Sequence, residues 1–178
     1  MVEHVRAILA AADRGLPERL PAATMTKLVE AYARPALVVP PALDPGTPGA
    51  LAALRERGLT LAVVSNTMRT PGATLRKLLA HFGILEHFAH TTFSDEVGIR
   101  KPAPEIFALT LRAVGGEPAT AVHVGDDLVL DVEGARATGM RVIQIANPPT
   151  RPKAGREPDI VIPGMAGLPA AVDELLAR

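Results

Sequence analysis

Residues 121–145 read AVHVGDDLVLDVEGARATGMRVIQI. Short runs rich in Val and Ile, at residues 121–124 and 141–145, flank a segment at 130–138 whose apolar side chains recur at helical spacing. Gly139 follows that segment, where a helix favours a left-handed C-terminal cap. A strand, a helix and a strand in this order indicate part of a parallel β sheet.

The same alternation continues on both sides of this stretch. It predicts strands at residues 60–64, 90–93 and 159–162, and helices at 49–57, 70–82, 104–114 and 168–176. Helices that alternate with short buried strands predict an α/β fold with a Rossmann-like, doubly wound parallel sheet covered on both faces. Two further helices, at 2–12 and 24–33, are predicted to open the chain, and prolines make residues 36–48 a connector.

Composition excludes several classes of function. The chain has 178 residues, of which 48% are hydrophobic, enough to bury one sizeable core. Lys plus Arg and Asp plus Glu are equal at 19 each, so we expect no nucleic-acid or membrane partner. Without cysteine there is no thiol catalysis, Cys-bound zinc or disulfide. No apolar run reaches transmembrane length, and we expect a cytoplasmic protein.

Polar side chains follow the strands of the predicted sheet, at the edge where a doubly wound sheet binds ligands. Ser65 and Asn66 come directly after residues 60–64, and their hydroxyl and backbone amides suit phosphoryl oxygens. Lys101 lies between a loop and a helix that starts at a proline, where its ammonium could neutralise a transferring group. The alternatives are a turn or helix cap for Ser65 and Asn66, and a solvated surface lysine.

Three carboxylates crowd the end of the strand at residues 121–124. They belong to Asp126, Asp127 and Asp131. Acidic side chains this close repel one another unless a cation compensates, and oxygen ligands suit Mg²⁺. The alternative is a helix N-cap with solvated neighbours. Together with the serine and the lysine, the three acids indicate a site that handles a phosphoryl group.

Three segments resemble motifs two, three and four of the haloacid dehalogenase-like hydrolase superfamily. They read LAVVSNT at 61–67, GIRKPAPEIF at 98–107 and VGDDLVLDVEGARATGM at 124–140. The resemblance implies that Ser65 and the Asn66 backbone bind the phosphoryl group and that Lys101 pairs with nucleophile and phosphate charge. It also implies that Asp126 binds Mg²⁺.

The resemblance implies supporting roles for the two other acids. Asp131 would hold the water shell of the metal or orient Lys101. Asp127 would contact the ligands of the metal rather than the metal itself. Ser-Asn-Thr with Gly-Asp-Asp resembles the magnesium-dependent phosphatase branch, which acts on a small phosphomonoester through an aspartyl-phosphate. The alternatives are a metal-independent haloacid dehalogenase and a non-catalytic regulatory protein that binds Mg²⁺ and phosphate.

One expected motif does not occur in this sequence. The chemistry of the superfamily begins at a strand that ends in Asp-x-Asp-Gly-Thr. The segment at 37–47 has Asp44 and Thr47, but Ala42 stands at the first acidic position and two prolines interrupt the run. The missing strand is expected between the strands that end at Ser65 and Gly125. We expect truncation first, with a segment upstream of Met1 carrying the strand; a partner chain or a true loss are the alternatives.

The same resemblance divides the chain into two parts. Residues 1–35 are expected to be a partial helical cap, and 36–178 the Rossmann-like core, inactive as it stands without the nucleophile. The histidines show no metal-ligand spacing, and His123, inside a buried strand, is expected to be structural.

Overall fold

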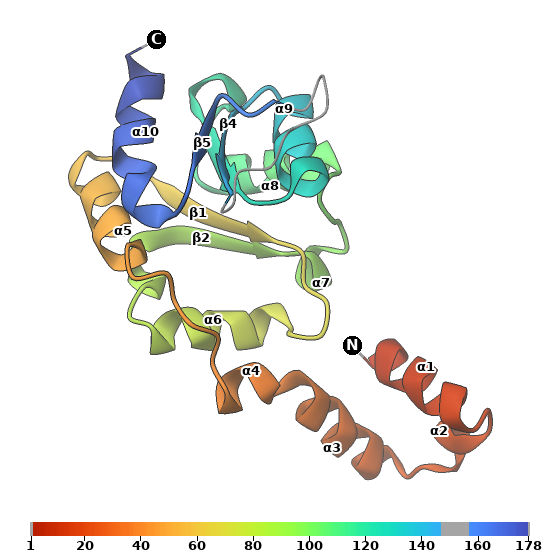
Figure 1. Cartoon of the computed structure of the whole chain (residues 1–178). Coiled ribbons are helices and arrows are strands. Elements are labelled where there is room, and N and C mark those ends of the chain that lie inside the picture. Colours follow the sequence, from red (N-terminus) through yellow and green to blue (C-terminus); the bar gives the residue numbers. More distant parts are fainter. Residues whose placement is uncertain (1, 147–156, 178) are drawn as a thin grey trace.

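The computed structural model describes residues 2–146 and 157–177 as an α/β fold (Figure 1). Its strands are β1 (Leu61–Ser65), β2 (Phe88–Phe93), β3 (Val122–Gly125), β4 (Arg141–Ile145) and β5 (Ile160–Ile162). Its helices are α1 (Val2–Ala12), α2 (Leu16–Arg19), α3 (Ala22–Ala33), α4 (Pro35–Val38), α5 (Thr47–Glu56), α6 (Gly72–His81), α7 (Ser94–Val97), α8 (Pro104–Ala113), α9 (Gly134–Ala137) and α10 (Leu168–Leu176). Single turns lie at η1 (Leu85–His87), η2 (Pro118–Thr120), η3 (Leu128–Glu133) and η4 (Met165–Gly167).

The strands form two parallel sheets, whereas the sequence predicted one sheet that lacks a strand between those that end at Ser65 and Gly125. One sheet pairs β1 with β2, and the other has the order β3-β4-β5. Ser65 pairs with Phe93 at the end of the first sheet, and Gly125 pairs with Gln144 at the end of the second. In the described residues β1 and β3 are not hydrogen-bonded to each other, so each presents one unpaired edge.

A cavity of about 340 Å³ separates these two edges. Leu61 and Val64 of β1 line it together with Val122 and Val124 of β3. Side chains from α8, α5 and α10 also contribute to the lining, as do those of the loops that lead into β1 and β3. Ala62, in the middle of β1, is exposed, which is unusual for a strand inside a parallel sheet. The cavity is therefore lined as expected for the place of a β strand that is covered by helices on both faces.

Helices cover both faces of the β3-β4-β5 sheet, as the doubly wound prediction requires. Ile143 of β4 packs with Leu54 of α5 and Leu175 of α10 in one buried cluster. The preceding residue, Val142, packs with Phe107 of α8 in a second cluster on the other face, to which α9 and η3 also contribute. Neighbouring strand residues point to opposite faces, so β4 is buried on both.

The predicted boundaries agree with the observed helices and strands to within two residues, except in one region and in three short helices. The helix predicted at 130–138 is divided into a π-helical turn, η3, and the short α9. Helices α2, α4 and α7 have four residues each, too few to give a helical period in the sequence. Helix α7 ends at Gly98, whose φ of 71° is the left-handed conformation of a glycine cap.

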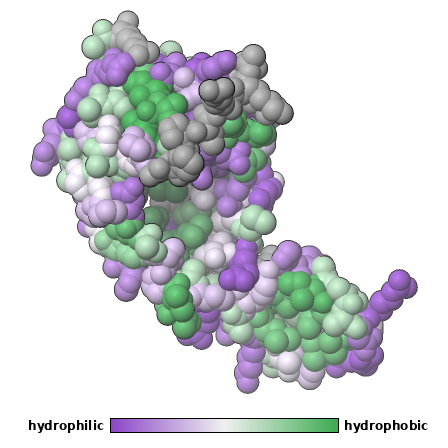
Figure 2. All heavy atoms as spheres, in the orientation of Figure 1, coloured by the Kyte–Doolittle hydropathy of each residue, from purple (hydrophilic) through white to green (hydrophobic). Residues whose placement is uncertain are grey.

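Helices α1 to α3 lie apart from both sheets in Figure 1; α1 packs against α2 and α3, and Val5 of α1 and Met25 of α3 are buried. Hydrophobic residues gather on the face of this part that Figure 2 shows, and its exposed large hydrophobic side chains are Val2, Ile8 and Leu28. Its assignment as a partial cap stays a prediction. Within the described residues, no helix is long and apolar enough to cross a membrane.

Candidate functional site

The loop after β1 is joined to the Lys101 loop by one side chain. The Asn66 carboxamide oxygen accepts a hydrogen bond from the Lys101 backbone nitrogen at 2.8 Å. Its nitrogen donates to the Lys101 carbonyl at 2.9 Å. The Asn66 side chain therefore pairs with both backbone groups of Lys101, as a neighbouring strand would. These bonds fix the position of the Lys101 backbone, from which the side chain extends. The role expected for the Asn66 backbone, phosphoryl binding, stays a prediction.

A second network holds the same two loops together. The Thr67 backbone nitrogen donates to Ser94 Oγ at 2.9 Å, and Thr67 Oγ1 donates to Asp95 Oδ1 at 2.9 Å. Arg100 Nη1 donates to the Thr67 carbonyl at 2.8 Å. Thr67 and Ser94 are buried. The segment that begins at Ser65 thus rests on bonds to residues 94–101, and substitution of these partners would disturb both loops.

Lys101 reaches from this loop to the other sheet. Its Nζ lies 2.6 Å from Asp131 Oδ1, and the two side chains are only 12% and 4% exposed. His123 Nε2, from β3, lies 2.8 Å from the same oxygen. The Asp127 backbone nitrogen donates to the other oxygen, Oδ2, at 3.1 Å. The Asp131 carboxylate therefore receives three donors from three different segments.

These donors decide the charge of the carboxylate. Burial by itself raises the pKa of Asp131. Hydrogen bonds from His123 and Lys101, together with their charges, outweigh the burial and hold the pKa of Asp131 well below its ordinary value. Asp131 is an ionised carboxylate at neutral pH, and the Lys101 ammonium is its counter-charge.

Two local features bring Asp131 over the end of β3. A Cβ at Gly125 would lie 2.2 Å from Asp131 Cγ, so only glycine leaves room for the acid there. The π-helical turn η3 starts directly after Asp127, whose carboxylate accepts from the backbone nitrogens of Val129 and Leu130, each at 2.8 Å. Asp127 is thus the N-cap of this turn, the alternative that its sequence position left open.

Asp126 differs from its two acidic neighbours. It is exposed, and no other side chain or backbone group in the described parts of the chain bonds its carboxylate. Ser65 is half-buried, and its hydroxyl likewise has no partner among residues 2–146 and 157–177. The structure thus leaves one hydroxyl at the end of β1 and one carboxylate at the end of β3 available for a ligand.

The three acids do not form a metal cage. Residues 2–146 and 157–177 contain no group of three or more His, Asp or Glu side chains arranged to hold a metal ion. The crowding that predicted a cation is relieved by Lys101, His123 and backbone N–H groups at Asp131 and Asp127. Mg²⁺ is commonly bound by one or two carboxylates, with water and phosphate oxygens completing its shell. The free carboxylate of Asp126 fits one such ligand.

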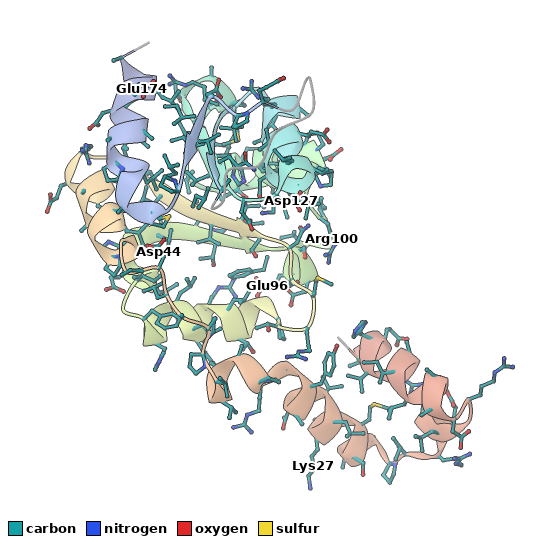
Figure 3. All side chains as sticks on the ribbon, viewed as in Figure 1. Lys27, Asp44, Glu96, Arg100, Asp127 and Glu174 are labelled. Carbon is teal, nitrogen blue, oxygen red and sulfur yellow. The ribbon has the colours of Figure 1, made fainter. Side chains whose placement is uncertain are left out.

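Figure 3 labels Arg100, in the loop that carries Lys101, and Asp127, which follows β3. Both residues lie on the side of the molecule toward which β1 and β2 point. This is the carboxyl-end edge at which doubly wound sheets bind ligands. His123 was expected to be structural, and its contact with Asp131 was not predicted from the sequence, although a signal existed. Alternate strand residues share a face, so His123 faces the same side as Gly125, directly under the position of Asp131.

Comparison with known proteins assigns the family. A family model described as haloacid dehalogenase-like hydrolase matches residues 2–139. Haloacid dehalogenase-like hydrolase domain-containing protein 3 of Mus musculus is 38% identical over 126 residues, covering 69% of this chain and 49% of that protein. Phosphoserine phosphatase of Thermus thermophilus is 38% identical over 131 residues, covering 74% of this chain and 49% of that protein.

A solved structure agrees with this assignment. The crystal structure of a HAD phosphatase from Thermococcus onnurineus superposes with a TM-score of 0.67 at 31% identity, over 82% of this chain and 63% of that one. The chain spans about half the length of the two curated relatives. Because the family model covers more than half of the residues, the protein belongs to the haloacid dehalogenase-like hydrolases.

Proposed function

We propose that this protein provides the phosphate- and metal-binding part of a magnesium-dependent phosphatase that acts on small phosphomonoesters. The observation that carries the proposal is the unbroken series of contacts from Asn66 through Lys101 to Asp131 and the Asp127 backbone. These contacts connect the end of β1 to the end of β3. The hydroxyl of Ser65 and the carboxylate of Asp126, both available for a ligand, lie at these two ends. The phosphatases among its relatives support this reaction over dehalogenation.

Each residue has a role in this proposal. The Ser65 hydroxyl and the backbone nitrogen of Asn66 bind the phosphoryl oxygens. Lys101, held by Asp131, places a fixed positive charge beside the phosphoryl group, where negative charge develops in the transition state. Asp126 supplies a carboxylate to Mg²⁺, which when bound neutralises phosphoryl charge. Asp131 orients Lys101, and Asp127 shapes the turn that carries them.

The nucleophile is proposed to enter on a strand that docks between β1 and β3. Both strands offer an unpaired edge to the same 340 Å³ hollow, and apolar side chains predominate in its lining. A strand buried there would be apolar on both faces and would end beside Ser65 and Gly125. We propose that it carries the Asp-x-Asp-Gly-Thr segment that the family resemblance implies, supplied by residues outside this sequence or by a partner chain.

Phosphate binding by the chain itself tests the site. We expect calorimetry to detect Mg²⁺-dependent binding of inorganic phosphate or tungstate, lost in Ser65→Ala and in Lys101→Met. Lys77→Met is the matched control, because Lys77 is exposed on α6 and should leave binding unchanged. Equal loss in both lysine variants, or no loss in either, would contradict the assignment of Lys101.

Activity requires the docked strand. A protein in which a strand ending in Asp-x-Asp-Gly-Thr is joined upstream of residue 1 is expected to hydrolyse p-nitrophenyl phosphate with Mg²⁺. Changing the first aspartate of that segment to asparagine should abolish turnover. Absence of turnover over a panel of phosphomonoesters, with Mg²⁺ and phosphate still bound, would instead support the non-catalytic regulatory alternative.

A further inference from the structure

His123 is a buried polar side chain for which the proposed reaction has no role. Its ring is only 8% exposed, in the middle of β3. On one side Nε2 lies 2.8 Å from Asp131 Oδ1. On another the ring meets Phe107 edge to face, with centroids 5.1 Å apart and an interplanar angle of 89°. The ring is therefore held in one orientation by an aromatic contact and by an acid.

The direction of the hydrogen bond follows from the charge of its acceptor. Asp131 is ionised, so its Oδ1 can only accept, and His123 Nε2 must donate. The same oxygen accepts from Lys101 Nζ at 2.6 Å. One donor comes from the strand β3 and the other from a loop. The strand donor is the more rigid of the two, because β3 is paired along its length with β4.

We propose that His123 is a positioning residue for Lys101, acting through Asp131. His123 of β3 holds Oδ1 of Asp131 in place, and the Asp127 backbone nitrogen holds Oδ2. The carboxylate therefore cannot turn away from Lys101. Lys101 then meets a fixed acceptor, and its ammonium is held at one point beside the end of β1. The proposal rests on the proposed function only for the importance of Lys101 in catalysis.

A residue that merely fills the core would behave differently. Leucine could fill much of the space beside Phe107, and Asp131 Oδ1 would keep Lys101 Nζ as a donor, so no buried polar atom would be left without a partner. Leucine would nevertheless leave Oδ1 with a single donor, the lysine itself. If the Lys101 ammonium loses its fixed position in a leucine variant that still folds, His123 positions the lysine and does not merely fill the core.

Three variants provide the test: His123→Gln, His123→Leu and His123→Asn. Glutamine can place its side-chain nitrogen near the position of Nε2, whereas leucine and the shorter asparagine cannot. The protein is labelled with ¹⁵N-lysine, and the ammonium cross-peak of Lys101 is recorded. The chain has four lysines, so the peak is identified by its absence in Lys101→Arg. A buried, ion-paired ammonium exchanges slowly with water and gives a peak that exposed lysines do not.

The expected result is a Lys101 peak in the wild type and in His123→Gln, and its loss in His123→Leu and His123→Asn. Backbone spectra establish which variants are folded, and if the leucine variant is not, glutamine against asparagine decides. An unchanged Lys101 peak in the folded leucine or asparagine variant, or its loss in the glutamine variant, would overturn the proposal. So would a wild type without a Lys101 peak. The readout needs no turnover, so it can succeed or fail independently of the phosphatase proposal.

Discussion

Replacing Asp131 by asparagine is the sharpest perturbation of this site. Three donors point at the carboxylate: Lys101 Nζ and His123 Nε2 at Oδ1, and the Asp127 backbone nitrogen at Oδ2. Asparagine has only one acceptor oxygen and keeps no charge. If that oxygen serves the lysine and the histidine, the Asp127 N–H faces an NH₂ group and loses its acceptor.

The magnitude follows from burial. A buried N–H that loses its acceptor costs about 1–3 kcal/mol. Lys101 is 12% exposed, so losing Asp131 leaves a nearly buried ammonium without its counter-charge. Removing one partner of a buried ion pair costs about 3–5 kcal/mol. The two losses share the same atoms and do not add, so we expect Asp131→Asn to lower the free energy of unfolding by about 3–5 kcal/mol.

A double-mutant cycle with Lys101→Met separates the ion pair from the rest. Methionine removes the ammonium but keeps an unbranched apolar stem, so the double variant no longer buries an unpaired charge at this site. Urea denaturation of the four proteins should show a double variant less destabilised than the sum of the single variants, with a coupling of about 1–3 kcal/mol. Strict additivity, or a stable Asp131→Asn, would refute the reasoning that Asp131 carries the pair.

Three further outcomes can be measured by denaturation. Gly125→Ala should cost about 3 kcal/mol, because its Cβ would meet Asp131 Cγ at 2.2 Å, whereas Gly49→Ala, in open space on α5, should gain about 0.5 kcal/mol. Asn66→Ala should cost about 2 kcal/mol, since both backbone groups of Lys101 lose a partner. Burial raises the pKa of Asp131, but its hydrogen-bond donors outweigh burial and hold this pKa below 3.8. As the pH falls, Asp131 is therefore protonated in the unfolded chain before it is protonated in the folded protein. The stability advantage of wild type over Asp131→Asn should therefore be constant above about pH 5 and shrink only below about pH 4.

The order of strands and helices could be predicted from the sequence, because hydrophobic periodicity and glycine caps are local signals. The strand at 141–145 and the helix at 168–176 were predicted at the residues where β4 and α10 are observed. Parallel strands end at one edge, so the polar residues after them could also be placed on the same side of the fold. The π-helical turn escaped prediction because its bonding depends on how Asp131 packs over Gly125.

By itself, the sequence determined which segments fold and which polar residues gather at the carboxyl ends of the strands, since both follow from residues close together in the chain. Only the tertiary structure decided what each polar group bonds. The family resemblance left Asp131 two roles, holding the water shell of a metal or orienting Lys101, and packing places it against Lys101, thirty residues away, and against His123. Among the described residues, the division into two sheets falls between β1 and β3, where the family resemblance had already implied a missing strand. Periodicity describes which way a side chain faces, whereas its partner is set by the distances that the packed chain imposes.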